Sequence, residues 1–183
     1  MRTEPSQLRL AAFIVVGSLL AGCAPLIGSV NTLSHMKPPT NPLFKVIFPD
    51  SISLTERIIR EHIEKKMAEH GYQKASPEEV LNVAVLYKYS VGSGIASVSR
   101  SPDFVWGGQR VESSSEYPRF FEVVLVDLEK SQAPEAIKTI WQGEVYSSGS
   151  STNISRLAPH FIDVLFENYG STVTNRRFSK FID

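Results

Sequence analysis

Two segments with strand-type patterns, close together in the second half of the chain, restrict its fold more than any other feature. Residues 120–128 are almost continuously apolar, as in a central strand covered on both faces, and residues 139–147 alternate apolar and polar side chains. The polar stretch between them contains Pro134, which favours a hairpin loop. Residues 82–89 alternate in the same way, so we expect several neighbouring strands in an antiparallel sheet.

Two helices are expected to accompany this sheet. Ser53 and Glu56 have the spacing of a capping box at the start of a helix over residues 53–70, and Gly71 supplies a left-handed stop. A second helix is expected over residues 155–169. The predicted fold class is therefore α+β, with an antiparallel sheet of about four to six strands and two main helices packed on one face.

The first residues have the features of an export signal. Arg2 and Arg9 precede an apolar run over residues 10–20, which is too short to cross a bilayer as a helix and ends in Leu20-Ala21-Gly22-Cys23. This arrangement resembles the bacterial lipoprotein signal. The resemblance implies cleavage between Gly22 and Cys23, diacylglycerol on the Cys23 sulfur, and a fatty acid such as palmitate on the new amino terminus. The alternative is an ordinary signal peptide that ends near an unmodified cysteine.

This signal leads to an expected division of the chain. Residues 1–22 are the signal peptide, and residues 23–42, which are rich in proline, are the lipidated cysteine with a flexible tether. A single α+β domain follows over residues 43–175, and residues 176–183 are a C-terminal tail. An aspartate directly after the cysteine would resemble an inner-membrane retention signal, but this chain has Ala24 there. We therefore expect an outer-membrane anchor with the domain facing the periplasm.

Four short segments carry a further resemblance. They are His70-Gly71-Tyr72, Val124 to Leu128, Ile140 to Val145, and Phe166 to Tyr169. Their order is similar to that in a bacterial lipoprotein family catalogued as domain of unknown function 4136, and the likeness covers about residues 43–175. Membership of that family implies a periplasm-facing α+β domain without assigned catalytic residues.

Composition argues against several kinds of function. Lys and Arg together number 19, as do Asp and Glu, and this balance is not that of a dedicated nucleic-acid binder. The single cysteine rules out an intramolecular disulfide, and four scattered histidines argue against a zinc site. We therefore expect no metal and no cofactor other than the covalent lipid on Cys23.

The most irregular segment, residues 90–119, holds the candidate contact surface. It is rich in serine and glycine and contains Phe104 and Trp106, with Tyr117 near its end. Long segments of this kind are often binding loops, and exposed aromatic side chains suit a protein partner. The alternative is a structural hairpin, with short strands over residues 95–99 and 104–111.

The expected function is a membrane-anchored, non-catalytic binding or assembly module of the cell envelope. Its partners would be the lipid bilayer, through the acyl chains, and an envelope protein, but no nucleic acid. The alternative is a periplasmic hydrolase acting on peptidoglycan or glycans, with Glu112, Glu116 or Glu122 converging as paired acids.

Overall fold

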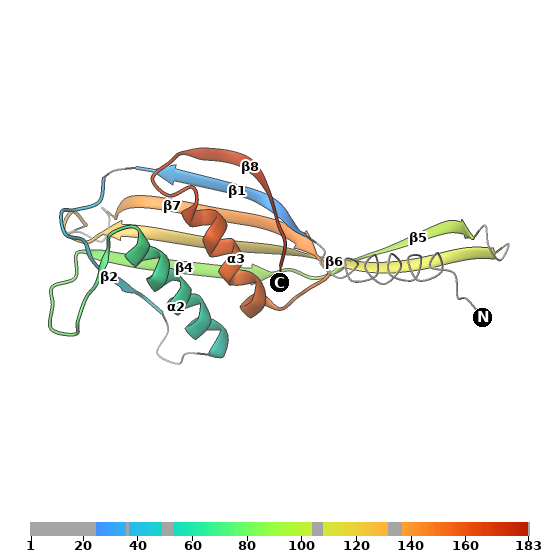
Figure 1. The fold of residues 1–183 in the computed structure, drawn as a ribbon, viewed down its shortest axis with the longest axis horizontal. Coiled ribbons are helices and arrows are strands. Elements are labelled where there is room, and N and C mark those ends of the chain that lie inside the picture. The colour runs from blue at the N-terminus through green and yellow to red at the C-terminus, as the bar shows by residue number, and fades with distance from the viewer. Residues whose placement is uncertain (1–24, 36, 49–52, 104–107, 132–136, 183) are drawn as a thin grey trace, which may run out of the picture.

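The computed structural model describes residues 25–35, 37–48, 53–103, 108–131 and 137–182. Over these residues the chain has an α+β fold with a mostly antiparallel sheet (Figure 1). The elements in chain order are β1 (Leu26–Ser34), β2 (Leu43–Val46), α2 (Leu54–Glu69), β3 (Gln73–Lys74), β4 (Val83–Val91), β5 (Ile95–Asp103), β6 (Gly108–Asp127), β7 (Lys138–Gly149), α3 (Ile154–Phe166) and β8 (Val173–Lys180).

The strand order in the sheet is β3-β2-β4-β6-β7-β1-β8, and β5 pairs with β6 off this path. The β2 strand is parallel to β3 and β4, and the other described pairs are antiparallel. The predicted hairpin between the two central strands is confirmed, because β6 pairs with β7 through a bulge between Leu125 and Val126. The eight strands of the described part exceed the expected four to six.

The predicted start of the first helix is confirmed atom by atom. The Ser53 hydroxyl accepts a hydrogen bond from the Glu56 amide at 3.2 Å, and the Glu56 carboxylate accepts one from the Ser53 amide at 2.8 Å. Gly71 follows the helix with a φ of 84°, a conformation that costs glycine little. The apolar stripe of α2 is buried at Ile59, Ile63 and Met67.

The expected flexible tether over residues 23–42 is wrong for residues 26–34. These residues form β1, which lies between β7 and β8 (Figure 1). Leu26 and Val30 are buried at 3% and 1% exposure, and Val30 lies opposite Val145 of β7. The strand contains Gly, Ser and Asn between its apolar residues and lies between prolines, so its local sequence resembles a linker. Its neighbours β7 and β8 come from far along the chain.

The expected tail over residues 176–183 is also wrong, because β8 extends to Lys180 and pairs with β1. Its side chains are mostly exposed, so this edge strand lacks the apolar alternation that predicts a strand. The Arg176 guanidinium donates a hydrogen bond to the buried Asn168 side chain at 2.8 Å. The folded domain therefore extends beyond the predicted 43–175 at both ends.

The core is formed by buried residues of the sheet, α3 and α2. Phe161 of α3 packs on Phe121 of β6 with ring centroids 6.2 Å apart, and Phe166 packs on Trp141 of β7 at 5.7 Å. A Cβ atom at Gly143 would lie 2.6 Å from the Trp141 ring, so glycine permits this close approach. The α3 helix contacts β1, β6 and β7, whereas the main contacts of α2 are with α3 and with β2 and β3 at one end of the strand order.

Candidate functional site

The most prominent surface feature is a two-stranded arm, formed by residues 95–103 of β5 and residues 108–116 of β6. It projects from one end of the sheet (Figure 1). At Tyr117 the β6 strand pairs with β7, so the arm joins the body there. Nine paired residues at about 3.3 Å each make the arm about 30 Å long.

The arm side chains that the structure describes, at residues 95–98 and 113–116, are exposed. Ile95 and Val98 are 67% and 64% exposed, although both are large apolar side chains. Ser97 and Ser114, which lie opposite each other, are hydrogen-bonded at 2.7 Å through their hydroxyl groups. An isolated two-stranded hairpin is only marginally stable in water, and its free edges can pair with a further strand. Such a structure suits contact with a partner.

The base of the arm is held to the body by close backbone packing. The Gly92 amide donates a hydrogen bond to the Pro118 carbonyl at 2.8 Å. A Cβ atom at Gly94 would lie 2.7 Å from the Tyr117 ring, so this ring lies against bare backbone. Gly92 and Gly94 therefore lie where the arm joins the body, and their lack of a side chain permits this close packing.

For residues 90–119, the hairpin alternative is confirmed in its backbone, with β5 extending to Asp103 and β6 described from Gly108. Tyr117 is half-buried at the base of the arm. Phe104 and Trp106, which complete the predicted contact surface, lie outside the described residues, as do Gly22 and Cys23.

A second feature is a polar row across the sheet, on the face opposite the one that α3 contacts. Glu122 of β6 and Glu144 of β7 lie in register, and the Gln142 amide donates hydrogen bonds to both carboxylates, at 2.7 and 3.3 Å. The Lys88 ammonium lies 2.7 Å from the Glu122 carboxylate, and the Lys88 side chain is 67% exposed to solvent. The pKa of Lys88 is raised by its hydrogen bond to Glu122. The row is internally paired.

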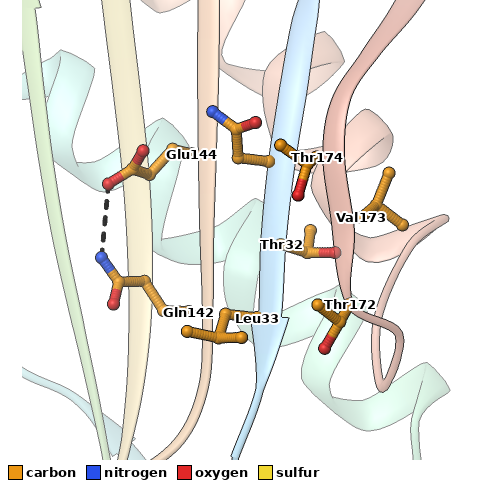
Figure 2. A pocket seen from close by; sticks show the side chains of 8 residues that line it. Thr32, Leu33, Gln142, Glu144, Thr172, Val173 and Thr174 are labelled. Carbon is orange, nitrogen blue, oxygen red and sulfur yellow. Dashed lines mark hydrogen bonds between the residues drawn. The ribbon is translucent and has the colours of Figure 1, made fainter.

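A shallow groove of about 370 Å³ continues this face toward β1 and β8 (Figure 2). Its lining residues are Asn31, Thr32, Leu33, Gln142, Glu144, Thr172, Val173 and Thr174. Several of its polar groups already have partners: Thr32 donates to the Ser171 carbonyl at 2.8 Å, and Asn31 accepts from the Asn175 amide at 2.7 Å. Sequence patterns could not reveal this groove, because β1 lies in the predicted tether and β8 extends into the predicted tail.

Of the carboxylates considered for a hydrolase, Glu116 and Glu122 do not converge. Glu116 and Glu122 are six residues apart on the same extended strand, which separates them by about 20 Å. Glu116 is exposed and accepts a hydrogen bond from Ser148, whereas Glu122 is 6% exposed and paired with Lys88. The side chain of Glu112 lies outside the described part.

Two of the histidines lie where the helices meet. His62 Nε2 is 3.1 Å from Asp163 of α3, and the Lys66 ammonium is 2.9 Å from the same carboxylate. Burial alone would raise the Asp163 pKa, but the hydrogen bonds from Lys66 and His62 outweigh it and lower the pKa below its ordinary value. His70 packs on Tyr169 with ring centroids 4.6 Å apart.

The described residues form neither a metal site nor a membrane-spanning helix. Within the described ranges, no three His, Cys, Asp or Glu side chains come together as a metal site would require. None of the helices in these ranges combines the length and apolar character needed to cross a membrane.

No family model matches the chain, and no curated protein matches it. Among solved structures, it is similar to a PDZ domain protein from Parabacteroides distasonis, with 12% identity and a TM-score of 0.51 over 92% of this chain. The match spans 41% of that protein, less than half its length. A PelC dodecamer from Paraburkholderia phytofirmans matches 75% of this chain and 93% of its own, with 12% identity and a TM-score of 0.42. The first likeness concerns the fold alone.

Proposed function

We propose that the chain is a lipid-anchored lipoprotein of the cell envelope that acts as a non-catalytic binding or assembly module. Cys23 is the proposed anchor, and the domain faces the periplasm from the outer membrane. Leu20-Ala21-Gly22-Cys23 supports the anchor. In this proposal the arm is the contact surface, and Phe104 and Trp106 belong to the same segment.

The exposed arm is the observation that carries the binding function. Ile95 and Val98 present apolar surface on a ribbon whose β5 strand pairs, among described strands, with β6 alone. A partner strand added to β5 would satisfy its free backbone groups and cover these side chains, which is the usual chemistry of β-strand addition. The proposed partner is therefore an envelope protein with an open strand edge.

The position of β1 restricts where this partner lies. The β1 strand begins at Leu26, three residues after Cys23, so an anchor on Cys23 would hold the domain close to the bilayer. Gly28 of β1 and Arg119 of β6 both pair with Ser147, which places the start of β1 level with the base of the arm (Figure 1). An arm that leaves the anchored end would reach a partner seated at the same membrane.

The proposal also assigns the two faces of the sheet. Packing of α2 along α3 supports a covered face shared by both helices, which leaves the face bearing Glu122 and Glu144 free. In this arrangement a partner held by the arm could also lie over the polar row.

Photo-crosslinking in intact cells tests the binding function. A photoreactive amino acid at Val98 of the arm is compared with the same group at Val80, which is 87% exposed on the body. We expect a discrete protein adduct from position 98 that position 80 does not form. Equal adduct patterns at the two positions, or adducts with lipid alone, would contradict the proposal.

Metabolic labelling with a fatty-acid analogue tests the anchor separately. The parent chain should incorporate the label, and Cys23→Ser should not, because the serine hydroxyl replaces the thiol that would carry the lipid. Equal labelling of the two chains would refute lipidation at Cys23.

A further inference from the structure

A small cavity lies where the arm meets the body, at the end of the sheet where β1 begins. Its volume is about 220 Å³, enough for several water molecules at about 30 Å³ each or for one phosphate group. The lining residues are Pro25, Leu26, Arg119, Ser148, Gly149, Ser150, Ser151, Arg156, Leu157 and Ile182. This described lining contains two arginines and three serines but no carboxylate.

Arg119 is the central cation of the cavity. The residue is 5% exposed, and its Nε atom is buried without a hydrogen-bond partner in the described structure. Burial lowers the pKa of Arg119, and the charge of Glu116 partly offsets this effect. The Ser147 hydroxyl, in register with Arg119, is likewise buried without a partner among described residues. Such groups are costly unless something binds them.

The Arg119 guanidinium lies against Gly149, and both residues line this cavity. A Cβ atom at Gly149 would lie 2.5 Å from Arg119 Nη2, so the glycine leaves the space that the guanidinium occupies. Ser148 donates its hydroxyl proton to Glu116 at 3.2 Å, so that proton is already used within the chain. The Ser151 hydroxyl accepts a hydrogen bond from the Asn153 amide, so its own proton can be donated to a ligand.

A planar guanidinium beside hydroxyl donors matches the geometry of an oxyanion, because the fork of N–H groups binds two oxygens at once. Arg156 adds a second positive charge to the wall, although it already has a partner within the chain. Phosphate is the oxyanion whose several oxygens could use both the guanidinium and the serine hydroxyls.

We propose that the cavity around Arg119 is a phosphate-binding site. Pro25 is part of its lining and is two residues from Cys23, so a phospholipid headgroup beside the anchor is the source that this position favours. The choice of a lipid source rests on the proposed function, whereas the site itself rests on the geometry of Arg119. Free phosphate is the other source of the same chemistry.

The test uses the full chain with Cys23→Ser, which removes any acyl anchor, and two probes. Inorganic phosphate is titrated calorimetrically, and vesicles of phosphatidylglycerol are compared with vesicles of phosphatidylcholine by flotation. Arg119→Met removes the guanidinium. Gly149→Ala keeps the guanidinium but displaces it, because the added Cβ atom would lie 2.5 Å from Arg119 Nη2. Arg57→Met, at an exposed arginine of α2, is the matched control.

We expect Arg119→Met to weaken phosphate binding at least tenfold, Gly149→Ala to weaken it less, and Arg57→Met to leave it unchanged. Loss of phosphatidylglycerol binding in the same two variants identifies a lipid headgroup, whereas loss of phosphate binding alone identifies free phosphate. No phosphate binding by the parent, or equal binding by Arg119→Met, overturns the site whatever the outcome of lipid labelling. The melting temperature of Arg119→Met should equal or exceed that of the parent, because a buried guanidinium whose Nε atom has no partner in the described structure is removed.

Discussion

Truncation of Val30 tests the most consequential difference between the sequence-based expectation and the structure. Val30 is 1% exposed in β1 and lies opposite Val145. Val30→Ala removes two methyl groups, worth about 1.6 kcal/mol at roughly 0.8 kcal/mol per carbon. The cavity left behind adds to this loss, so we expect the free energy of unfolding to fall by about 2 to 3 kcal/mol. In a flexible tether, the same change would have no measurable effect.

Leu33→Ala is the matched control, because Leu33 lies in the same strand but is 44% exposed. Urea unfolding, followed by fluorescence of the buried Trp141, gives both free energies. With a slope of about 2 kcal/mol per molar urea, the midpoint of Val30→Ala should fall by roughly 1 M. Leu33→Ala should shift the midpoint by less than half as much. Midpoints for Val30→Ala and the parent that agree within error would refute the placement of β1 in the core.

Three further predictions concern the core, the helix pair and the arm. Gly143→Ala should lower the free energy of unfolding by about 1 to 3 kcal/mol, because its Cβ would collide with the Trp141 ring, and urea unfolding measures this. Asp163 has a lowered pKa in the fold, so its contribution is present above its ordinary pKa and is lost as pH falls through the lower folded value. Asp163→Asn should therefore lower stability at pH 7 by about 1 kcal/mol and flatten the loss of stability below about pH 4; parallel acid titrations would disprove this. In hydrogen exchange, the β5 amides should exchange at least about 100-fold faster than those of β7, because β5 pairs, among described strands, with β6 alone and its described side chains are exposed; equal protection would contradict its isolation.

The elements that the sequence predicts correctly are those with a strong local signal. The capping box of Ser53 and Glu56 starts α2, because its hydrogen bonds join residues only three positions apart. The central strands β4, β6 and β7 alternate or run continuously apolar, and both patterns depend on burial. The sequence leaves residues 90–119 open between a binding loop and a hairpin, because a stretch rich in serine and glycine carries no apolar alternation that identifies a strand.

The sequence alone predicts export and anchoring from Cys23 and the apolar run before it, because that signal is local and does not depend on the fold. The class of fold is also determined by sequence, through the periodicities of 2 and 3.6 residues. Three features are visible only in the tertiary structure: β1 is a strand, β8 pairs with it, and Arg119 lies buried beside Gly149. The physical reason is that backbone pairing between β1, β7 and β8 joins residues more than 100 positions apart, and such partners leave no mark on the local sequence.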